Sequence, residues 1–326
     1  MIITKSPLRI SLGGGGTDLQ SYYKNNEGFL ISAAINKYVY VTIMKPFKEG
    51  IYLKYSKIEK LKKIEEVKHK IIKECLKLFK NKINQIEITT LTDIPAGTGL
   101  GSSGSFTVAL IKALHEFHKK NILSEKLAEL ACDIEINKLK NPIGKQDQYI
   151  SAYGGVREFR FMKNGKVVSN NLKISQENLF SLEDNLLLFF TGYSREANKI
   201  LKKQNDDTKK NNEDMIENLN FVKKIGLESK KCLEKGDFNK FAELMNIHWE
   251  HKQNRSKKMT KPEINKIYNL ALKNGALGGK LVGAGGGGFL MFYSNDKEKL
   301  RSIMKKKNLE EVRFNFDFNG TRTIIT

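Results

Sequence analysis

A glycine-rich stretch from Asp93 to Ser105 is the first place where this sequence could do chemistry. It reads GTGLGSS from Gly97 to Ser103, and it joins a strand-like run to a helix whose apolar residues recur on one face. The first N–H groups of a helix lack intrahelical partners and the helix dipole is positive there, so such a turn favours an anion. The pattern predicts a phosphate-binding loop.

Three other interpretations of this loop compete with a phosphate-binding role. The letters from Gly99 to Gly104 match the G-x-G-x-x-G dinucleotide motif, but the next helix leads to another helix and not to a strand ending in an acidic residue. A Walker A loop needs Lys followed by Ser or Thr after its last glycine, and Gly101 is followed by Ser102 and Ser103. A glycine turn without any ligand is the structural alternative.

Two carboxylates are placed to serve a phosphate loop. Glu135 lies near the end of a helix predicted over 124–138, and Asp147 lies near the start of another short helix, after Pro142 and Gly144 interrupt the chain. That turn can return both carboxylates to one cleft, although each alone is also an ordinary capping interaction. Phosphoryl transfer needs oxygen ligands for Mg²⁺, an acceptor for the proton of the attacking hydroxyl, and cations beside the phosphoryl group. The loop and the carboxylates together predict that chemistry.

Two further glycine turns accompany this set. The first strand carries Arg9 and enters Gly13-Gly-Gly-Gly-Thr-Asp18, where Asp18 is either a substrate ligand or the cap of a short helix. A third glycine turn lies between two strands, within Gly278 to Tyr293. Glycines let a backbone approach a ligand closely at an entropic cost, which favours a role beyond connecting two elements.

The elements that must position these residues are a mixture of strands and helices. β-Branched and aromatic runs predict strands at 2–12, 28–44, 51–55, 86–91, 156–162, 167–174, 186–190, 312–318 and 321–325. Apolar spacing and capping signals predict helices over 64–79, 103–119, 124–138 and 296–306, lysine- and asparagine-rich helices up to about residue 257, and one that opens at Pro262. A polar stretch at 175–184 is the predicted boundary between domains 1–182 and 183–326. The sequence therefore predicts an α/β (α+β) protein of two domains.

The composition argues for an ordinary globular protein. The net charge of +21 comes from 57 Lys and Arg against 36 Asp and Glu, and the lysines are interleaved with acidic and amide residues. This distribution favours a lysine-rich solvated surface over nucleic-acid binding. Three widely spaced cysteines suit reduced thiols, and neither a signal-peptide pattern nor a membrane-spanning run is present in the sequence. We expect a cytoplasmic protein with no nucleic-acid or membrane partner.

The order of the three glycine segments, with Glu135 and Asp147 between the second and the third, resembles the GHMP kinase superfamily. Pro95 to Gly104 reads PAGTGLGSSG and is similar to that family's phosphate motif P-x-x-x-G-L-G-S-S-A. Gly104 replaces the usual Ala, a change that we expect a helix N-terminus to tolerate. Segments 7–18, 142–148 and 275–288 look closest to the bacterial D-glycero-D-manno-heptose 7-phosphate kinases, with L-fucokinases next. The resemblance implies an N-terminal lobe with the phosphate loop on a βαβ crossover, a ferredoxin-like C-terminal lobe, and an active site between them.

The resemblance also implies a role for individual residues. Asp147 would be the catalytic base, and Arg9 would lie beside it and the transferred phosphoryl. The ATP-binding residues would be Pro95, Gly97, Gly99, Leu100, Gly101, Ser102 and Ser103, and the Mg²⁺ ligands would be Ser103 and Glu135. The substrate-binding residues would be Gly15, Gly16, Thr17, Asp18, Lys145, Arg195, Gly285 and Gly286. Lys145 and Arg195, together with Lys252 and Lys280, are the candidates for binding a second phosphate on the substrate.

The implied reaction transfers the γ-phosphoryl of ATP to the anomeric hydroxyl of D-glycero-D-manno-heptose 7-phosphate. Its product would be the 1,7-bisphosphate, used for nucleotide-activated heptose and surface polysaccharide synthesis. An unphosphorylated sugar related to L-fucose or galactose is the alternative acceptor, and a catalytically silent sugar sensor is the alternative outside catalysis. The joint presence of Arg9, Ser103, Glu135 and Asp147 argues against silence. ATP and Mg²⁺ are the expected cofactors and a sugar phosphate is the expected partner, while the sequence leaves a homodimer open.

Overall fold

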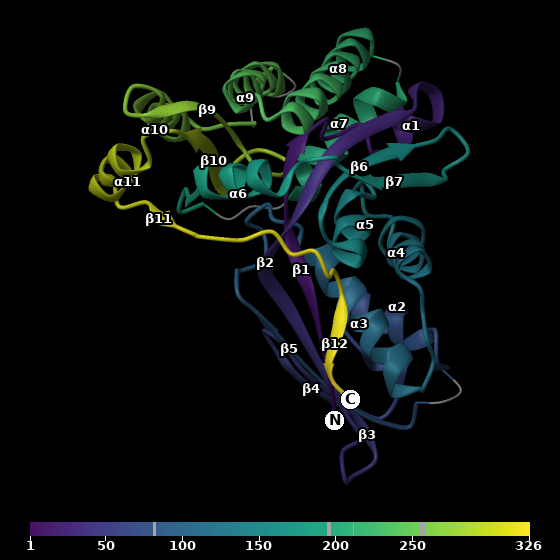
Figure 1. The fold of residues 1–326 in the computed structure, drawn as a ribbon. Coiled ribbons are helices and arrows are strands. Elements are labelled where there is room, and N and C mark those ends of the chain that lie inside the picture. Colours follow the sequence, from purple (N-terminus) through teal and green to yellow (C-terminus); the bar gives the residue numbers. More distant parts are fainter. Residues whose placement is uncertain (81–82, 194–196, 211, 255–258) are drawn as a thin grey trace.

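Two β-sheets organise the chain, one in each half of the molecule (Figure 1). The computed structural model describes residues 1–80, 83–193, 197–210, 212–254 and 259–326. Most of the first sheet lies in the lower half of the view, where the two termini are close together, while its strands β6 and β7 lie at the upper right. The second sheet lies at the upper left, beside α9 and α10. This is the mixed α/β architecture that the sequence predicts.

The first sheet has eight strands, ordered β12-β1-β2-β5-β3-β4, with β6 and β7 added beside β2. The strands are β1 (Ile2–Gly13), β2 (Gly28–Met44), β3 (Gly50–Lys54), β4 (Ile58–Leu61), β5 (Gln85–Thr92), β6 (Val156–Phe161), β7 (Val167–Asn171) and β12 (Arg322–Ile325). β2 pairs with β1 along most of its length, with β5 through its second half and with β6 through its first half. β3 and β5 run parallel, which requires a crossover connection between them. The crossover ends in β5, and the glycine loop follows β5.

The helices of this half pack on one another and on the first sheet. They are α1 (Gln20–Asn26), a 3₁₀ turn η1 (Ile64–Glu66), α2 (Lys70–Lys77), α3 (Ser102–Phe117), α4 (Ser124–Cys132), a π-helical segment η3 (Asp133–Lys138) and α5 (Gln146–Tyr153). α3 packs against β1 and β2, and its apolar residues from Val108 to Leu114 are almost completely buried. The helix that follows the glycine loop is thus fixed by the core, which holds the loop in place.

The second sheet confirms the ferredoxin-like prediction. β8 (Leu186–Phe190), β9 (Ala276–Leu281), β10 (Phe289–Ser294) and β11 (Glu310–Glu311) form an antiparallel sheet in the order β11-β8-β10-β9. The chain reaches these strands as β8, helices, β9, β10, α11 and β11, which is the βαββαβ pattern. The helices of this half are α6 (Gln176–Asn185), α7 (Ala197–Lys209), α8 (Glu213–Lys235), α9 (Phe238–Gln253), α10 (Pro262–Leu272) and α11 (Lys297–Lys306).

Two local predictions were wrong, and one segment forms a helix that was not predicted. The helix expected over 64–79 is divided into η1 and α2, because residues 67–69 are non-helical and His69 accepts the N–H of Ile72 at the start of α2. The polar stretch at 175–184, for which no helix was predicted, is mostly the helix α6, which Ser175 caps by accepting the N–H of Asn178. The run at 312–318 is not a continuous strand, since Phe316 alone forms a bridge, to Ile35.

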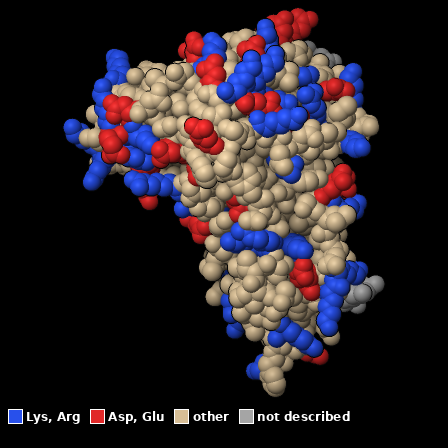
Figure 2. Space-filling model, viewed as in Figure 1, with Lys and Arg blue, Asp and Glu red and all other residues tan. Residues whose placement is uncertain are grey.

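The domain boundary near residue 182 stays a prediction. β12 follows the second sheet in sequence yet pairs antiparallel with β1, so the end of the chain lies in the first sheet. Figure 2 shows basic and acidic side chains interspersed on the face in view. Within the part of the chain that the structure describes, none of the helices is long and apolar enough to cross a membrane.

Candidate active site

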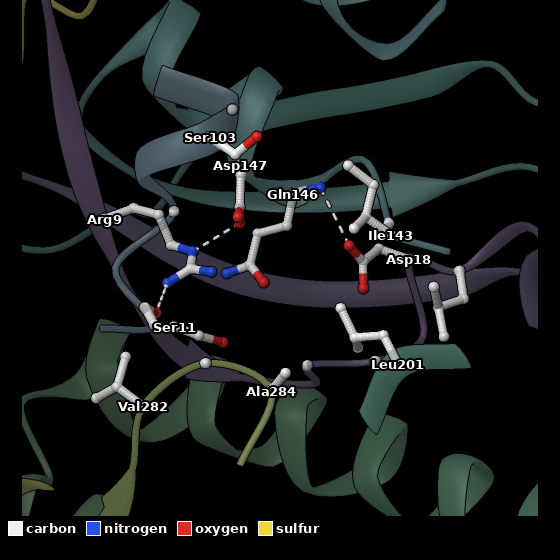
Figure 3. A pocket seen from close by; sticks show the side chains of 18 of the residues that line it. Arg9, Ser11, Asp18, Ser103, Ile143, Gln146, Asp147, Leu201, Val282 and Ala284 are labelled. Atoms are coloured by element: carbon white, nitrogen blue, oxygen red, sulfur yellow. Dashed lines mark hydrogen bonds and ion pairs between the residues drawn. The ribbon is translucent and has the colours of Figure 1, made fainter. Parts of the chain in front are cut away.

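A pocket of about 610 Å³ brings all three glycine segments together. Its wall includes residues from β1, the first glycine turn, the phosphate loop, η3, α5, α7, α9 and the third glycine turn. Figure 3 shows Arg9, Asp147 and Gln146 across the middle of the pocket and Ser103 above them, with Asp18, Ile143 and Leu201 at one side. Segments far apart in the sequence therefore supply polar side chains to one cavity.

Arg9 and Asp147 form an ion pair in this pocket, with 2.7 Å between Arg9 Nε and Asp147 Oδ1. Arg9 also donates to the carbonyl of Gly99 through Nη1, and its backbone N–H donates to the carbonyl of Leu100. The arginine thus ties β1 to the phosphate loop and to α5. The Asp147 side chain is 29% exposed and the Arg9 side chain 7%, so the carboxylate is the partner that an incoming molecule can reach.

Glycines in the loop leave room for this pair. A Cβ at Gly101, where φ is +80°, would lie 3.1 Å from Asp147 Cγ and 3.2 Å from Arg9 Cγ. A Cβ at Gly104 would lie 2.6 Å from the Cβ of Asp147, closer than real Cβ atoms approach. The glycine at 104 therefore fits this packing, whereas an alanine would force α5 away from α3.

Ser103 and Glu135 meet above the ion pair. Ser103 Oγ donates to Glu135 Oε2 at 2.6 Å, and Gln148 Nε2 donates to the other carboxylate oxygen at 2.8 Å. Glu135 is completely buried on η3, and π-helical turns often mark functional positions. Burial raises the pKa of Glu135, although the hydrogen bonds from Ser103 and Gln148 oppose the shift.

These groups fit a divalent cation. Among the described residues, no lysine or arginine nitrogen lies within 4.0 Å of the Glu135 carboxylate, so a buried negative charge has no basic partner. The described residues contain no cluster of three or more His, Cys, Asp or Glu side chains that could hold a metal alone. Magnesium commonly takes one or two protein oxygens and completes its shell with phosphates and water. Ser103 and Glu135 match that requirement.

Asp18 stands at the other side of the pocket, and burial raises its pKa. The charge of Asp147 raises this pKa further, whereas the hydrogen bond that Asp18 Oδ2 accepts from Gln146 N–H, at 3.1 Å, lowers it. The backbone of Gly144 lies so near that a Cβ there would fall 1.8 Å from Asp18 Oδ2. No sequence pattern points to Gln146 beyond its position next to Asp147.

The other residues predicted to bind substrate differ in their placement. Gly15 and Gly16 line the pocket. Thr17 is buried and its hydroxyl donates to the carbonyls of Gly14 and Phe29, so it holds the turn together. Lys145 lies outside the pocket wall and donates to the carbonyl of Gly165, with its ammonium 5.3 Å from the Tyr23 ring centroid. Arg195 lies outside the described residues.

The third glycine turn reaches the pocket through Gly283 and Ala284, not through the two glycines that were predicted. Gly286 donates its N–H to Met259 O at 2.6 Å, and a Cβ at Gly285 would lie 2.1 Å from Met259 Sδ. Both glycines therefore serve close packing. In the phosphate loop, Pro95 is exposed and lies outside the pocket wall, and Leu100 belongs to the hydrophobic core.

Two lysines of the pocket wall donate hydrogen bonds to backbone carbonyls next to the first and third glycine turns. Lys280, on β9, is 2% exposed and donates to the carbonyl of Leu12 at 2.8 Å. Burial lowers the pKa of Lys280 to about 7. Lys252 donates to the carbonyls of Leu281 and Gly283. Nearby, the buried Oγ of Ser11 has no hydrogen-bond partner among the described residues, which leaves it able to bind a polar ligand.

Comparisons with known proteins agree with this arrangement. The family model described as the GHMP kinases N terminal domain matches residues 70–155, and the one described as GHMP kinases C terminal matches residues 229–310. The D-glycero-alpha-D-manno-heptose 7-phosphate kinase of Campylobacter jejuni is 31% identical over 99% of this chain and 98% of its own length. The L-fucokinase/L-fucose-1-P guanylyltransferase of Bacteroides fragilis is 26% identical over 92% of this chain and 35% of its own length.

A solved structure has the same fold. The D-glycero-D-manno-heptose 1-phosphate kinase from Bacteroides thetaiotaomicron is 26% identical, with a TM-score of 0.82 over 100% of this chain and 99% of that one. Full-length similarity, two matching domain models and a pocket where three glycine segments meet lead to one conclusion: this chain belongs to the GHMP kinase family.

Proposed function

We propose that this protein transfers the γ-phosphoryl group of ATP to the anomeric hydroxyl of D-glycero-D-manno-heptose 7-phosphate, giving the 1,7-bisphosphate. The observation that carries the proposal is the Arg9–Asp147 ion pair, which lies between the phosphate loop and Asp18 in one pocket. The 31% identity to the Campylobacter jejuni heptose 7-phosphate kinase supports this choice of acceptor. The cytoplasm, where ATP is supplied, is the compartment in which we expect the reaction.

The phosphate loop would bind the nucleotide. Gly97, Gly99 and Gly101 all have positive φ angles and precede the N-terminus of α3, so backbone N–H groups and the helix dipole can receive phosphate oxygens. Ser103 Oγ and a Glu135 oxygen would hold Mg²⁺. The bound ion would offset negative charge on the phosphates.

Asp147 would act as the base. It would accept the proton of the anomeric hydroxyl while the sugar oxygen forms its bond to the γ-phosphorus. The bond between that phosphorus and the bridging oxygen breaks, and ADP leaves with the electron pair. Arg9, fixed by Asp147 and the Gly99 carbonyl, would place its positive charge beside the group in transfer.

Asp18 would orient the acceptor. A buried carboxylate oxygen is a strong acceptor for sugar hydroxyls, and Gln146 N–H already fixes its orientation. Ser11 Oγ and the Gly15–Gly16 backbone would add polar contacts on the same side. An unphosphorylated sugar related to L-fucose is the second candidate, and the Bacteroides fragilis relative supports it.

A coupled ADP-release assay with Mg-ATP separates the two acceptors. Heptose 7-phosphate, the free heptose, L-fucose and galactose would be supplied in turn, and the product would be examined by ³¹P NMR. We expect ADP release with heptose 7-phosphate and a new phosphate resonance coupled to the anomeric proton. Turnover confined to the free sugars would overturn the heptose phosphate assignment.

A further inference from the structure

A second pocket of about 510 Å³ adjoins the first. Its wall comes from three separate segments: α1, the chain from 136 to 143, and α7. Figure 1 places α1 and α7 together at the upper right of the molecule, where the two helices contact each other. Nothing in the reaction described above uses this pocket.

The wall of the second pocket is basic and polar. Lys24, Lys140 and Lys209 line it from α1, the 136–143 segment and α7 respectively. The described residues of its wall include no Asp or Glu. Within the described part of the chain, none of the three ammonium groups has a carboxylate oxygen within 4.0 Å. Like charges around one cavity repel each other, so an anion in the cavity would be favoured.

Hydrogen-bonding groups accompany these charges. Most of the remaining wall consists of amide and hydroxyl side chains, among them Asn137, Asn205 and Thr208. Ser21 also lines the pocket, and its buried Oγ has no hydrogen-bond partner among the described residues. A buried hydroxyl left without a partner costs free energy that a bound acceptor group would recover. Phosphate oxygens are acceptors of that kind.

The two pockets share a wall on the acceptor side. Asn141 and Ile143 line both of them. The segment from Asp18 into α1 connects the two pockets, since Asp18 lines the first and Ser21 the second. Helix α7 does the same through Gln204 and Thr208. In Figure 3, Ile143 and Leu201 lie next to Asp18 and away from Arg9 and Val282. The basic pocket therefore lies beyond Asp18 as seen from Arg9.

We propose that this lysine pocket, defined by Lys24, Lys140 and Lys209, binds the phosphate monoester at the far end of the sugar acceptor. The inference rests on the proposed function, which places the reacting hydroxyl at Asp147 and the sugar ring against Asp18. A phosphate on the opposite terminus of the sugar then points past Ile143 towards the three lysines. Long lysine side chains can close around such a group as mobile point charges.

The test compares two triple variants with the same change in net charge. In one, Lys24→Gln, Lys140→Gln and Lys209→Gln remove the lysine pocket. In the control, Lys299→Gln, Lys305→Gln and Lys306→Gln remove three exposed lysines of α11, which lies at the left of Figure 1, away from α1 and α7. All six lysines are exposed, so we expect both variants to fold. Both variants lose three positive charges, so any general electrostatic attraction of the anionic substrate to the protein decreases equally in the two.

Steady-state kinetics give the first readout. With heptose 7-phosphate, we expect the pocket variant to raise KM at least about 10-fold over wild type, with kcat and the KM for ATP changed less than about 2-fold. The KM for free heptose should match that of the control. An equal KM for the phosphorylated sugar in the two variants would overturn the inference.

A binding measurement keeps the inference testable if the heptose assignment fails. The protein would be saturated with Mg²⁺ and a non-hydrolysable ATP analogue, which blocks the phosphate loop, and inorganic phosphate would be added while its ³¹P line width is followed. We expect broadening with wild type and control and none with the pocket variant. Identical broadening in all three proteins would overturn the lysine pocket as an anion site, whichever sugar the enzyme phosphorylates.

Discussion

The polar side chains at the two ends of the active-site pocket differ in how many partners they have within the protein. At the transfer end, Asp147 is paired with Arg9, and Glu135 accepts hydrogen bonds from both Ser103 and Gln148. At the acceptor end, Asp18 is also buried, but it accepts a hydrogen bond from the backbone N–H of Gln146 and from no side chain of the described residues. The buried hydroxyl of Ser11 has no partner there within the described chain.

This difference separates two tasks. Groups that are already oriented by one another lose little freedom when charge develops in the transition state, so the transfer end is organised for the chemical step. Buried polar groups without partners cost stability, and a ligand that pairs with them recovers that cost. The acceptor end is therefore organised to recognise a polar molecule. Changes at the first end should lower turnover, and changes at the second should weaken binding.

Asp147→Asn should produce the largest effect. The amide keeps the shape of the side chain but cannot accept the hydroxyl proton, so kcat should fall roughly 10²- to 10⁴-fold. The KM values for ATP and sugar should change little, because Asp147 is assigned to the chemical step. Steady-state ADP release measures both quantities. A kcat within 10-fold of wild type would remove Asp147 as the base.

Gly104→Ala should come next. The new Cβ would lie 2.6 Å from Asp147 Cβ, so α5 must shift and carry the base out of position. A displacement of this kind can lower kcat about 10- to 100-fold. Alanine in place of glycine usually stabilises a helix by about 1 kcal/mol, so an ordinary surface helix would gain stability. Wild-type kcat combined with a higher melting temperature would show that the close contact between α3 and α5 is unimportant.

Asp18→Asn should act on binding and stability in opposite directions. Loss of the carboxylate should raise the KM for the sugar about 10-fold, because a charged hydrogen-bond acceptor is lost. The folded-state pKa of Asp18 is raised above 3.8, so the folded protein holds this proton to higher pH than the unfolded chain. The contribution of Asp18 to the free energy of unfolding therefore falls as the pH rises from 3.8 through the higher pKa of the folded protein. At pH 7 the buried charge is destabilising.

Removing that charge should stabilise the protein at pH 7, and the gain should disappear as the pH falls below 3.8. Denaturant unfolding at several pH values would measure it. A variant that loses both sugar affinity and stability at neutral pH would contradict the comparison between the two ends.

Lys280→Met should have the smallest effect on turnover. The pKa of Lys280 in the folded protein is lowered to about 7, so its ammonium is charged below that pH and neutral above it. A charged Lys280 would attract an anionic substrate. Because Lys280 loses its charge between pH 6.5 and pH 8, we expect the wild-type KM for the sugar phosphate to rise roughly a few-fold over that range. The Lys280→Met variant should not show this rise in KM with pH. An identical pH profile of KM in both proteins would remove Lys280 from substrate binding.

Much of the fold was readable from local pattern. The strands and the helix around the phosphate loop follow from β-branched runs and helical spacing. The glycine loop lies between a strand, β5, and a helix, α3, as predicted from the sequence. No helix was predicted for the polar segment that forms α6, where helix propensity and the Ser175 cap outweigh low apolar content over a short span. The bridge at Phe316 depends on a partner far away in the chain, which no local pattern reveals.

The site was only partly predictable for a similar reason. Arg9, Asp147, Ser103 and Glu135 belong to motifs, and the structure brings them into one pocket. Glycine content alone did not separate a turn that faces the pocket from one that packs, as Gly285 against Met259 demonstrates. Lys24, Lys140 and Lys209 lie in three distant segments, so only tertiary structure gathers them around one cavity.

The single-turnover rate of phosphoryl transfer tests the division of the pocket most directly. Asp147→Asn and Asp18→Asn would each be mixed with saturating Mg-ATP and heptose 7-phosphate, and the labelled γ-phosphoryl in the sugar would be followed by rapid quenching. We predict that Asp147→Asn loses the rate at saturation, at least about 100-fold, while Asp18→Asn stays within about 10-fold of wild type once more sugar is supplied. Equal losses of the saturated rate in both variants would contradict the account.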